Sequence, residues 1–205
     1  MPSTLADWDA KYRERAELAP AEPASFVREL LPLLPEGPAL DVACGTGRHT
    51  LLLASRRQPV TAVDGSTVAL DILEARARES HHSFRRSVNA GRIVASKQGI
   101  HLVQADLERS NLTVNAFSLI VCVQYLQRSL FAQMERALLP DGMLLMETHT
   151  RAQLKFEGGP RNPDYLLESG ELREAFPGLR VLFYRDLSAG KGIASLIARK
   201  PSETD

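Results

Sequence analysis

The feature that most constrains the fold is an alternation of two kinds of apolar segment along the chain. Short runs, nearly continuous in apolar residues and bounded by turn residues, are typical of strands buried on both faces. They lie at residues 38–43, 59–64, 100–106, 117–125, 142–148, 179–187 and 192–200. The segments between them space apolar residues three or four positions apart, which is typical of a helix with one buried face. The first such set is Phe26, Val27, Leu30, Leu31 and Leu34.

This alternation predicts an α/β fold, in which a doubly wound, mostly parallel sheet of seven strands is covered by helices on both faces. The last two apolar runs are separated only by residues 188–191, a connection short enough for a hairpin. The last strand is therefore expected to run antiparallel. A chain of 205 residues that is 44% hydrophobic has material for one well-buried domain, and we expect residues 1–205 to form one.

Composition argues against several classes of partner. Lysine and arginine together number 25, as do aspartate and glutamate, so the charge balance favours neither nucleic acid nor an anionic membrane. No run approaches the ~20 apolar residues of a membrane-spanning helix, and no signal peptide is evident. Cys44 and Cys122 lie in short apolar runs, which fits a reducing cytoplasm. His81 and His82 stand in a basic segment at 76–99 without further ligands at fitting spacing, so no metal site is predicted.

The informative residues lie where strands are expected to end, because ligands bind a doubly wound sheet beyond the carboxyl ends of its strands. The first run continues into the stretch LDVACGTGRHT. Asp41 is inside the strand, and Gly45 and Gly47 allow a tight turn that a ligand can approach closely. The second run ends in Asp64, a position from which a carboxylate accepts ribose hydroxyls, and the third ends in Asp106.

Two ligand classes compete for this turn. A dinucleotide fold would carry a third glycine, G-x-G-x-x-G, where this chain has Thr50. The acid inside the strand, Asp41, also suits a cationic ligand, such as a sulfonium with an adjoining amino group, better than a pyrophosphate. A nicotinamide-dependent dehydrogenase is therefore the weaker alternative. Asp64 has a second interpretation as the cap of the helix that begins near Ser66, and the two roles are compatible.

The motifs together resemble those of class I S-adenosylmethionine-dependent methyltransferases. LDVACGTGR is similar to the first motif of that superfamily, VTAVDGS to its ribose acid, VQADLE to its adenine acid, and ALLPDGMLLMET to the turn into its fifth strand. These motifs follow each other in register over residues 38–148. WDAKY and AEPASFVRELLPLLP ahead of them, with Arg48 and His49, resemble the tellurite-resistance and thiopurine methyltransferase branch. NPDYLLESGEL and the final ASLIARK are more similar to uncharacterised bacterial members of that branch. The resemblance implies a Rossmann-like core at 36–205 and an N-terminal helical lid or cap at 1–35.

The resemblance also implies S-adenosylmethionine as cofactor and a set of contacts with it. The turn glycines would lie against its methionine part with Asp41 near the amino group, while Asp64 would hold the ribose hydroxyls. Asp106 would accept from the adenine amino group, and Tyr12 would lie over the cofactor from the lid. The predicted cofactor-binding residues are Tyr12, Asp41, Ala43, Gly45, Gly47, Asp64, Gly65, Ser66, Asp106, Leu107 and Val123. Core packing is the alternative for Tyr12, which shares a helix face with Trp8.

Methyl transfer from a sulfonium needs mainly alignment and exclusion of water, so no universal catalytic residue is expected. A sulfur, selenium, tellurium, oxygen or nitrogen nucleophile is compatible with the sequence, and a hydroxyl or amine would want a base. Catalytic candidates at the strand ends are Tyr125, Arg128 and His149, and Glu147 lies in the same region. Candidates for orienting the acceptor are Trp8, Arg48, Gln124 and Arg161. VQYL stands where methyltransferases of nucleic-acid amino groups carry Asn-Pro-Pro-Tyr, which favours a small-molecule acceptor.

We therefore expect a cytoplasmic enzyme, a monomer or homodimer, that methylates a small molecule and releases S-adenosylhomocysteine. The alternative is a non-catalytic protein that binds S-adenosylmethionine as a sensor or as a subunit supporting a partner. The sequence leaves this alternative open because a preserved cofactor site says nothing about an acceptor site.

Overall fold

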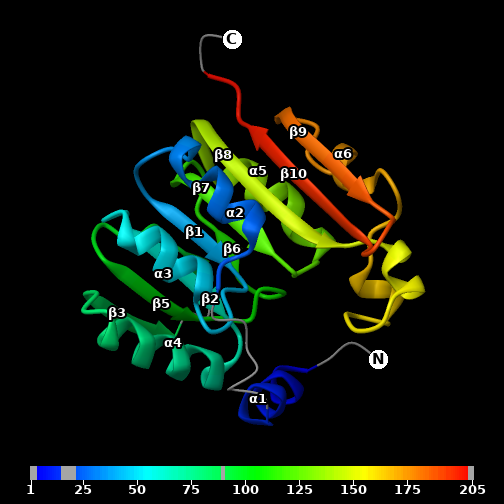
Figure 1. Cartoon of the computed structure of the whole chain (residues 1–205). Helices are drawn as coiled ribbons and strands as arrows, with labels where there is room; N and C mark the ends of the chain where they lie inside the picture. The colour runs from blue at the N-terminus through cyan, green and yellow to red at the C-terminus, as the bar shows by residue number, and fades with distance from the viewer. Residues whose placement is uncertain (1–3, 15–21, 89–90, 203–205) are drawn as a thin grey trace.

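The described residues form an eight-stranded sheet with helices on both faces (Figure 1). The structure, a computed structural model, describes residues 4–14, 22–88 and 91–202. The strands are β1 (Ala39–Val42), β2 (Val60–Asp64), β3 (Phe84–Val88), β5 (Ile100–Gln104), β7 (Phe117–Val123), β8 (Leu138–His149), β9 (Arg180–Leu187) and β10 (Ile193–Arg199). They lie in the order β3-β5-β2-β1-β7-β8-β10-β9. The first six in this order are parallel, and β10 is antiparallel to both β8 and β9, which confirms the predicted class and the antiparallel last strand.

The predicted count of seven strands is one too low, because β3 was not predicted. This strand, FRRSV, lies at the edge of the sheet and pairs only with β5 among the described strands. Its side chains are half-buried or exposed, with Val88 78% exposed, so it lacks the continuous apolar run of a central strand. The basic segment at 76–99 thus holds the end of a helix, this edge strand and the short β4 (Arg92–Ile93). β4 pairs with β6 (Asn111–Leu112) in a small second sheet.

Two apolar clusters cover the two faces of the sheet. On one face lie α2 (Ser25–Leu30), the 3-10 turn η2 (Leu31–Leu33), α3 (Arg48–Ser55) and α4 (Thr67–Glu79). On the other lie η3 (Arg128–Leu130), α5 (Phe131–Ala137) and α6 (Glu171–Glu174). Two further 3-10 turns, η4 (Arg151–Lys155) and η5 (Pro163–Tyr165), follow β8. Strand residues alternate between the clusters, as with Leu119 and Ile120, which explains why the central strands read as continuously apolar.

The helix α4 shows how local sequence sets an element at the ligand edge. Ser66 caps it by accepting the N–H of Ala69 on its hydroxyl, at 3.1 Å. Leu70 and Leu73 recur at helical spacing and are fully buried. Two arginines in the last turn complement the helix dipole. The N-terminus of α4 is thereby fixed directly after the end of β2.

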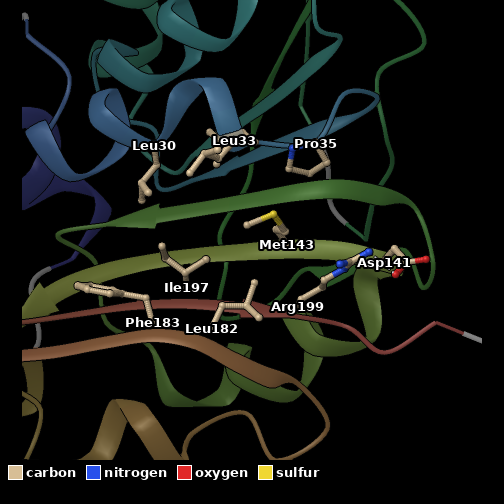
Figure 2. Close-up of a pocket in the computed structure, with 10 residues that line it drawn as sticks. Leu30, Leu33, Pro35, Asp141, Met143, Leu182, Phe183, Ile197 and Arg199 are labelled. Atoms are coloured by element: carbon tan, nitrogen blue, oxygen red, sulfur yellow. Dashed lines mark hydrogen bonds and ion pairs between the residues drawn. The ribbon is translucent and has the colours of Figure 1, made fainter. Parts of the chain in front are cut away.

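An apolar groove of about 460 Å³ lies between α2–η2 and the strands β8, β10 and β9 (Figure 2). Leu33, Met143 and Phe183 line it, and the ion pair of Asp141 with Arg199, 2.6 Å long, lies at its margin. Asp141 and Arg199 belong to the start of β8 and the end of the antiparallel β10. The groove therefore reaches toward the amino ends of the parallel strands and away from the glycine turn.

Candidate functional site

The candidate site lies at the carboxyl edge of the sheet, where the strand order reverses. β2 lies on one side of β1 and β7 on the other, so the helices that follow β1 and β7 leave toward opposite faces. This is the switch point at which doubly wound sheets bind ligands. The turn after β1, the turn after β2 and the loop after β5 all meet there. The structure thus brings the predicted glycines and acids to one edge.

The turn after β1 has three left-handed residues. Ala43 and Gly45 have φ of 53°, and Gly47 has φ of 85°. The two glycines serve different purposes. A Cβ on Gly47 would lie 2.0 Å from a methyl of Leu73, so this glycine lets α4 pack against the turn. A Cβ on Gly45 would lie 2.7 Å from the hydroxyl of Tyr12, so its face is turned toward α1 (Leu5–Glu14).

Asp64 joins the turns that follow β1 and β2. Its Oδ2 accepts the N–H of Gly45 and its Oδ1 accepts the N–H of Ser66, each at 2.8 Å. Burial raises the pKa of this carboxyl, and the two backbone hydrogen bonds oppose that shift. Each carboxylate oxygen has a second lone pair, so Asp64 can still accept ligand hydroxyls while it fixes both turns.

Asp41 lies beneath the glycine turn and is 1% exposed. Its Oδ2 accepts the hydroxyl of Thr50 at 2.6 Å, and burial raises its pKa to about 7. His49 is equally enclosed. Its Nε2 accepts the N–H of Ala24 at 3.2 Å, and burial lowers its pKa to about 3. His49 is therefore a neutral packing residue that links α3 to the start of α2.

The loop after β5 holds Asp106 and Leu107. Asp106 is half-buried, and its Oδ1 accepts the N–H of Glu108 at 2.9 Å while Oδ2 lies 3.5 Å from Arg109. Leu107 is buried and its carbonyl accepts Nε2 of Gln127 at 3.2 Å. This loop is ordered by its own backbone, next to the Asp64 turn, where the N–H of Ala105 bonds to the carbonyl of Asp64.

The helix α1 rests on the site, and two of its contacts were missed by the sequence analysis. Leu5 lies over Gly65, where a Cβ would come within 2.3 Å of its methyl. Asp9 accepts the hydroxyl of Ser66 at 2.5 Å and the N–H of Val68 at 3.3 Å, at the start of α4. The spacing of Leu5, Asp9 and Tyr12, on one helix face, was the available signal.

Of the other predicted N-terminal residues, Trp8 is 39% exposed with the ammonium of Lys11 4.1 Å from its ring. The predicted lid at 1–35 includes residues 1–3 and 15–21, which lie outside the described residues. Its second half, α2, packs Phe26 and Val27 into the core.

The acceptor candidates divide into engaged and available side chains. Arg128 binds Glu171 through Nε and Nη2, at 2.5 and 2.9 Å, and the carbonyl of Leu166 at 3.0 Å. Arg161 donates to two carbonyls of its own loop, at 2.9 and 2.8 Å. Tyr125 donates to Oε1 of Gln127, and burial raises its pKa. These three side chains are occupied in holding loops in place.

Other candidates border the end of β7. Val123 is its buried last residue, and Gln124 follows with a left-handed φ of 58°. The Nη2 of Arg48 donates to Oε1 of Gln124 at 2.9 Å. His149, at the end of β8, is half-buried, and burial lowers its pKa. Glu147, two residues earlier, is 8% exposed.

Among the described residues no group of three histidine, cysteine or acidic side chains is placed to hold a metal ion. No helix among them is long and apolar enough to span a membrane.

Comparisons with known proteins agree with this arrangement. TehB from Haemophilus influenzae aligns over 94% of this chain and 67% of its own, at 18% identity and a TM-score of 0.66. An S-adenosylmethionine dependent methyltransferase from Mesorhizobium loti aligns over 88% of this chain and 100% of its own, at 17% identity and a TM-score of 0.65. One from Aquifex aeolicus aligns over 93% and 97%, at 17% identity and a TM-score of 0.62. These likenesses concern the fold.

A search of curated protein sequences found no match. A protein-family comparison matches residues 40–146, more than half of the chain, to a family described as "Methyltransferase domain". That range begins just before the glycine turn and ends in β8, so it contains the whole switch point. The chain therefore belongs to the methyltransferase domain family, as a class I S-adenosylmethionine-dependent methyltransferase whose cofactor is S-adenosylmethionine.

Proposed function

We propose that the protein transfers a methyl group from S-adenosylmethionine to a small-molecule acceptor by in-line displacement. The observation that carries this proposal is the position of Asp64. It is a buried carboxylate at the switch point, held by the N–H groups of Gly45 and Ser66, with lone pairs left for two vicinal hydroxyls. The family match supports the ribose of S-adenosylmethionine as the ligand of that carboxylate.

The residues present fit the cofactor. Gly45 and Gly65 offer backbone without a Cβ at the two turns, and the side chains nearest to these faces come from α1, a helix with no buried residue. The turn after β1 would hold the methionine part, Asp64 the ribose, and the Asp106 loop the adenine. Asp41 would lie near the amino group, where a cation would favour its ionised form.

The protein's share of the chemistry is alignment and shielding. When bound, S-adenosylmethionine supplies a methyl group on a positively charged sulfur, so the donor is already activated. The end of β7, with Val123 and Gln124, would position the acceptor against it. Tyr12 and Leu5 on α1 would exclude water from above the turns.

A small molecule fits the acceptor role better than a macromolecule. The chain has no net charge at neutral pH, whereas nucleic-acid binding relies on a basic surface. Cys44 and Cys122 are both buried as free thiols, which is consistent with a cytoplasmic setting.

The test is mass-spectrometric detection of methylated product. The full chain would be incubated with methyl-labelled S-adenosylmethionine and either a panel of thiols, selenite, tellurite, phenols and amines or a small-molecule cell extract. We expect label on an acceptor and formation of S-adenosylhomocysteine. Tight cofactor binding with no labelled acceptor in either mixture would favour a binding protein over an enzyme.

A further inference from the structure

A row of polar side chains crosses three strands, β8, β10 and β9, at the carboxyl edge, beside the end of β7. In the strand register Val123 pairs with Glu147, Glu147 pairs with Ser195, and Ser195 pairs with Arg185. The face that these residues share is otherwise apolar and carries Leu145 and Ile197 next to α2. We call Glu147, Ser195 and Arg185 the polar row.

Glu147 is the end of the row nearest to β7, and one of its two carboxylate oxygens has no hydrogen-bond partner among the described residues. Its Oε2 accepts the hydroxyl of Ser195 at 2.7 Å and lies 3.5 Å from Nη2 of Arg185. Its Oε1 accepts no hydrogen bond within the described part of the chain. Oε1 is not among the buried atoms that lack a partner, so it reaches solvent and can take a hydrogen bond from a ligand.

Arg185 has a similar surplus of donors. Its Nη2 serves Ser195, at 3.2 Å, and Glu147. Its Nε is buried without a partner, and Nη1 makes no hydrogen bond to any residue that the structure describes. The side chain stays 40% exposed, with the guanidinium carbon 6.0 Å from the ring centre of Phe183. Nη1, at the exposed end of the guanidinium, is therefore the donor left for an anion.

Arg48 adds a second cation on the cofactor side of the row. It is the first residue of α3, where the helix dipole disfavours a positive charge. Its side chain donates a hydrogen bond to the neutral amide of Gln124. Burial lowers the pKa of Arg48, and the carboxylates of Asp41 and Glu147 act in the opposite direction. Asp41 is already bonded to Thr50. Arg48 and Arg185 thus both interact electrostatically with Glu147, so this part of the edge carries two cations for one carboxylate.

We propose that the acceptor is a small organic acid with a protic nucleophile. Its anionic group binds Nη1 of Arg185, and its hydroxyl, amine or thiol donates to Oε1 of Glu147. This inference rests on the proposed function. In the transfer, the nucleophile's lone pair forms the bond to the methyl carbon, the carbon–sulfur electron pair stays on sulfur, and the nucleophile's proton goes to Oε1 of Glu147.

Matched pairs of probes test the charge requirement. With S-adenosylhomocysteine saturating, calorimetry would compare 4-hydroxybenzoate with 4-hydroxybenzamide and mercaptoacetate with 2-mercaptoethanol. Each acid should bind about tenfold more tightly than its uncharged counterpart, the expected effect of one charge-assisted hydrogen-bond pair. Arg185→Met should reduce this ratio below about threefold. Arg180→Met, an exposed arginine on the same strand, is the control and should keep the ratio.

A second variant separates proton acceptance from packing. Glu147→Gln should not weaken binding of the acids, because it removes a negative charge beside the anion site. It should lower methyl transfer to the hydroxyl probe about 100-fold and leave transfer to the thiol probe, assayed above its pKa, nearly unchanged. A residue needed only for packing would affect both acceptors equally.

The outcomes distinguish the two proposals. Failure of the wild-type chain to bind S-adenosylhomocysteine would overturn the proposed function itself. If cofactor binding is intact, three results would overturn the acid-acceptor inference alone. They are equal affinity for acids and uncharged probes, no binding of any probe at about 10 mM, and an unaltered affinity ratio in Arg185→Met.

Discussion

Asp64 accepts the backbone N–H of Gly45 at 2.8 Å, although the two residues are 19 positions apart and belong to the turns of different strands. Its other oxygen takes the N–H of Ser66, so one carboxylate sets the spacing of both turns. This arrangement makes Asp64 a structural and a ligand-binding residue together, and the two roles can be measured separately.

Asp64→Ala should lose cofactor binding and some stability. It leaves two buried N–H groups without partners, which costs about 2 kcal/mol or more in the free energy of unfolding. It also removes the acceptor for two ribose hydroxyls, so affinity for S-adenosylhomocysteine should fall at least about 30-fold. Calorimetry and urea unfolding measure the two effects. Asp71→Ala, an exposed acid on α4, is the control for affinity, and wild-type affinity in Asp64→Ala would refute the site assignment.

Gly47 should be more sensitive to alanine than a glycine with the same backbone in open space. A Cβ at Gly47 adds left-handed strain, with φ of 85°, and a clash 2.0 Å from a methyl of Leu73. Gly170, with φ of 83°, has nothing within 4 Å of the added Cβ. We expect a loss of about 1 kcal/mol for Gly170→Ala and about 3 kcal/mol for Gly47→Ala. Equal decreases in the free energy of unfolding of the two variants, measured by chemical denaturation, would show that Leu73 moves aside without destabilising the fold.

The central fold and the ligand edge were predictable because they depend on local patterns. Strands buried on both faces read as continuous apolar runs, and Asp41, Gly45 and Asp64 stand at or next to their ends. β3 was not predictable by that criterion, because it has one neighbour in the sheet and its arginines reach solvent or α4. Edge strands lack the burial that produces the pattern.

Several predicted acceptor residues have partners in the fold that the sequence does not indicate. Arg128 is tied to Glu171, 43 positions later, and no local pattern announces a contact of that range. Glu147 was predicted and Ser195 and Arg185 were not, because only the register of β8, β10 and β9 brings these three together. Long-range register is the information that a single sequence does not carry in its periodicity.

Asp41→Asn should change stability in a pH-dependent way. The folded pKa of Asp41 is raised to about 7, above its unfolded value near ~3.9, so the native state holds a proton that the unfolded state has released. The resulting stabilisation is full below about pH 4 and is lost as pH rises through about 7. Asparagine does not titrate, so the stability of the variant relative to wild type should increase between pH 5 and pH 8. A constant difference across that range, measured by thermal or urea unfolding, would contradict the raised pKa.

The contact of α1 with the site gives the last prediction. α1 has no buried residue, and Asp9 binds the start of α4 through the hydroxyl of Ser66 and the N–H of Val68. Charge-assisted bonds of this kind contribute about 1.5–3 kcal/mol, so Asp9→Ala should raise amide exchange in residues 5–14 about tenfold or more. Glu14→Ala, at the exposed end of the same helix, is the control and should change exchange little.

The same variant reports on how the cofactor enters. Tyr12 and Leu5 lie directly on Gly45 and Gly65, so a ligand that contacts those glycines must displace α1 first. Asp9→Ala should therefore speed association of S-adenosylhomocysteine in stopped-flow experiments. Unchanged association together with faster amide exchange would mean that the cofactor reaches the turns without moving α1.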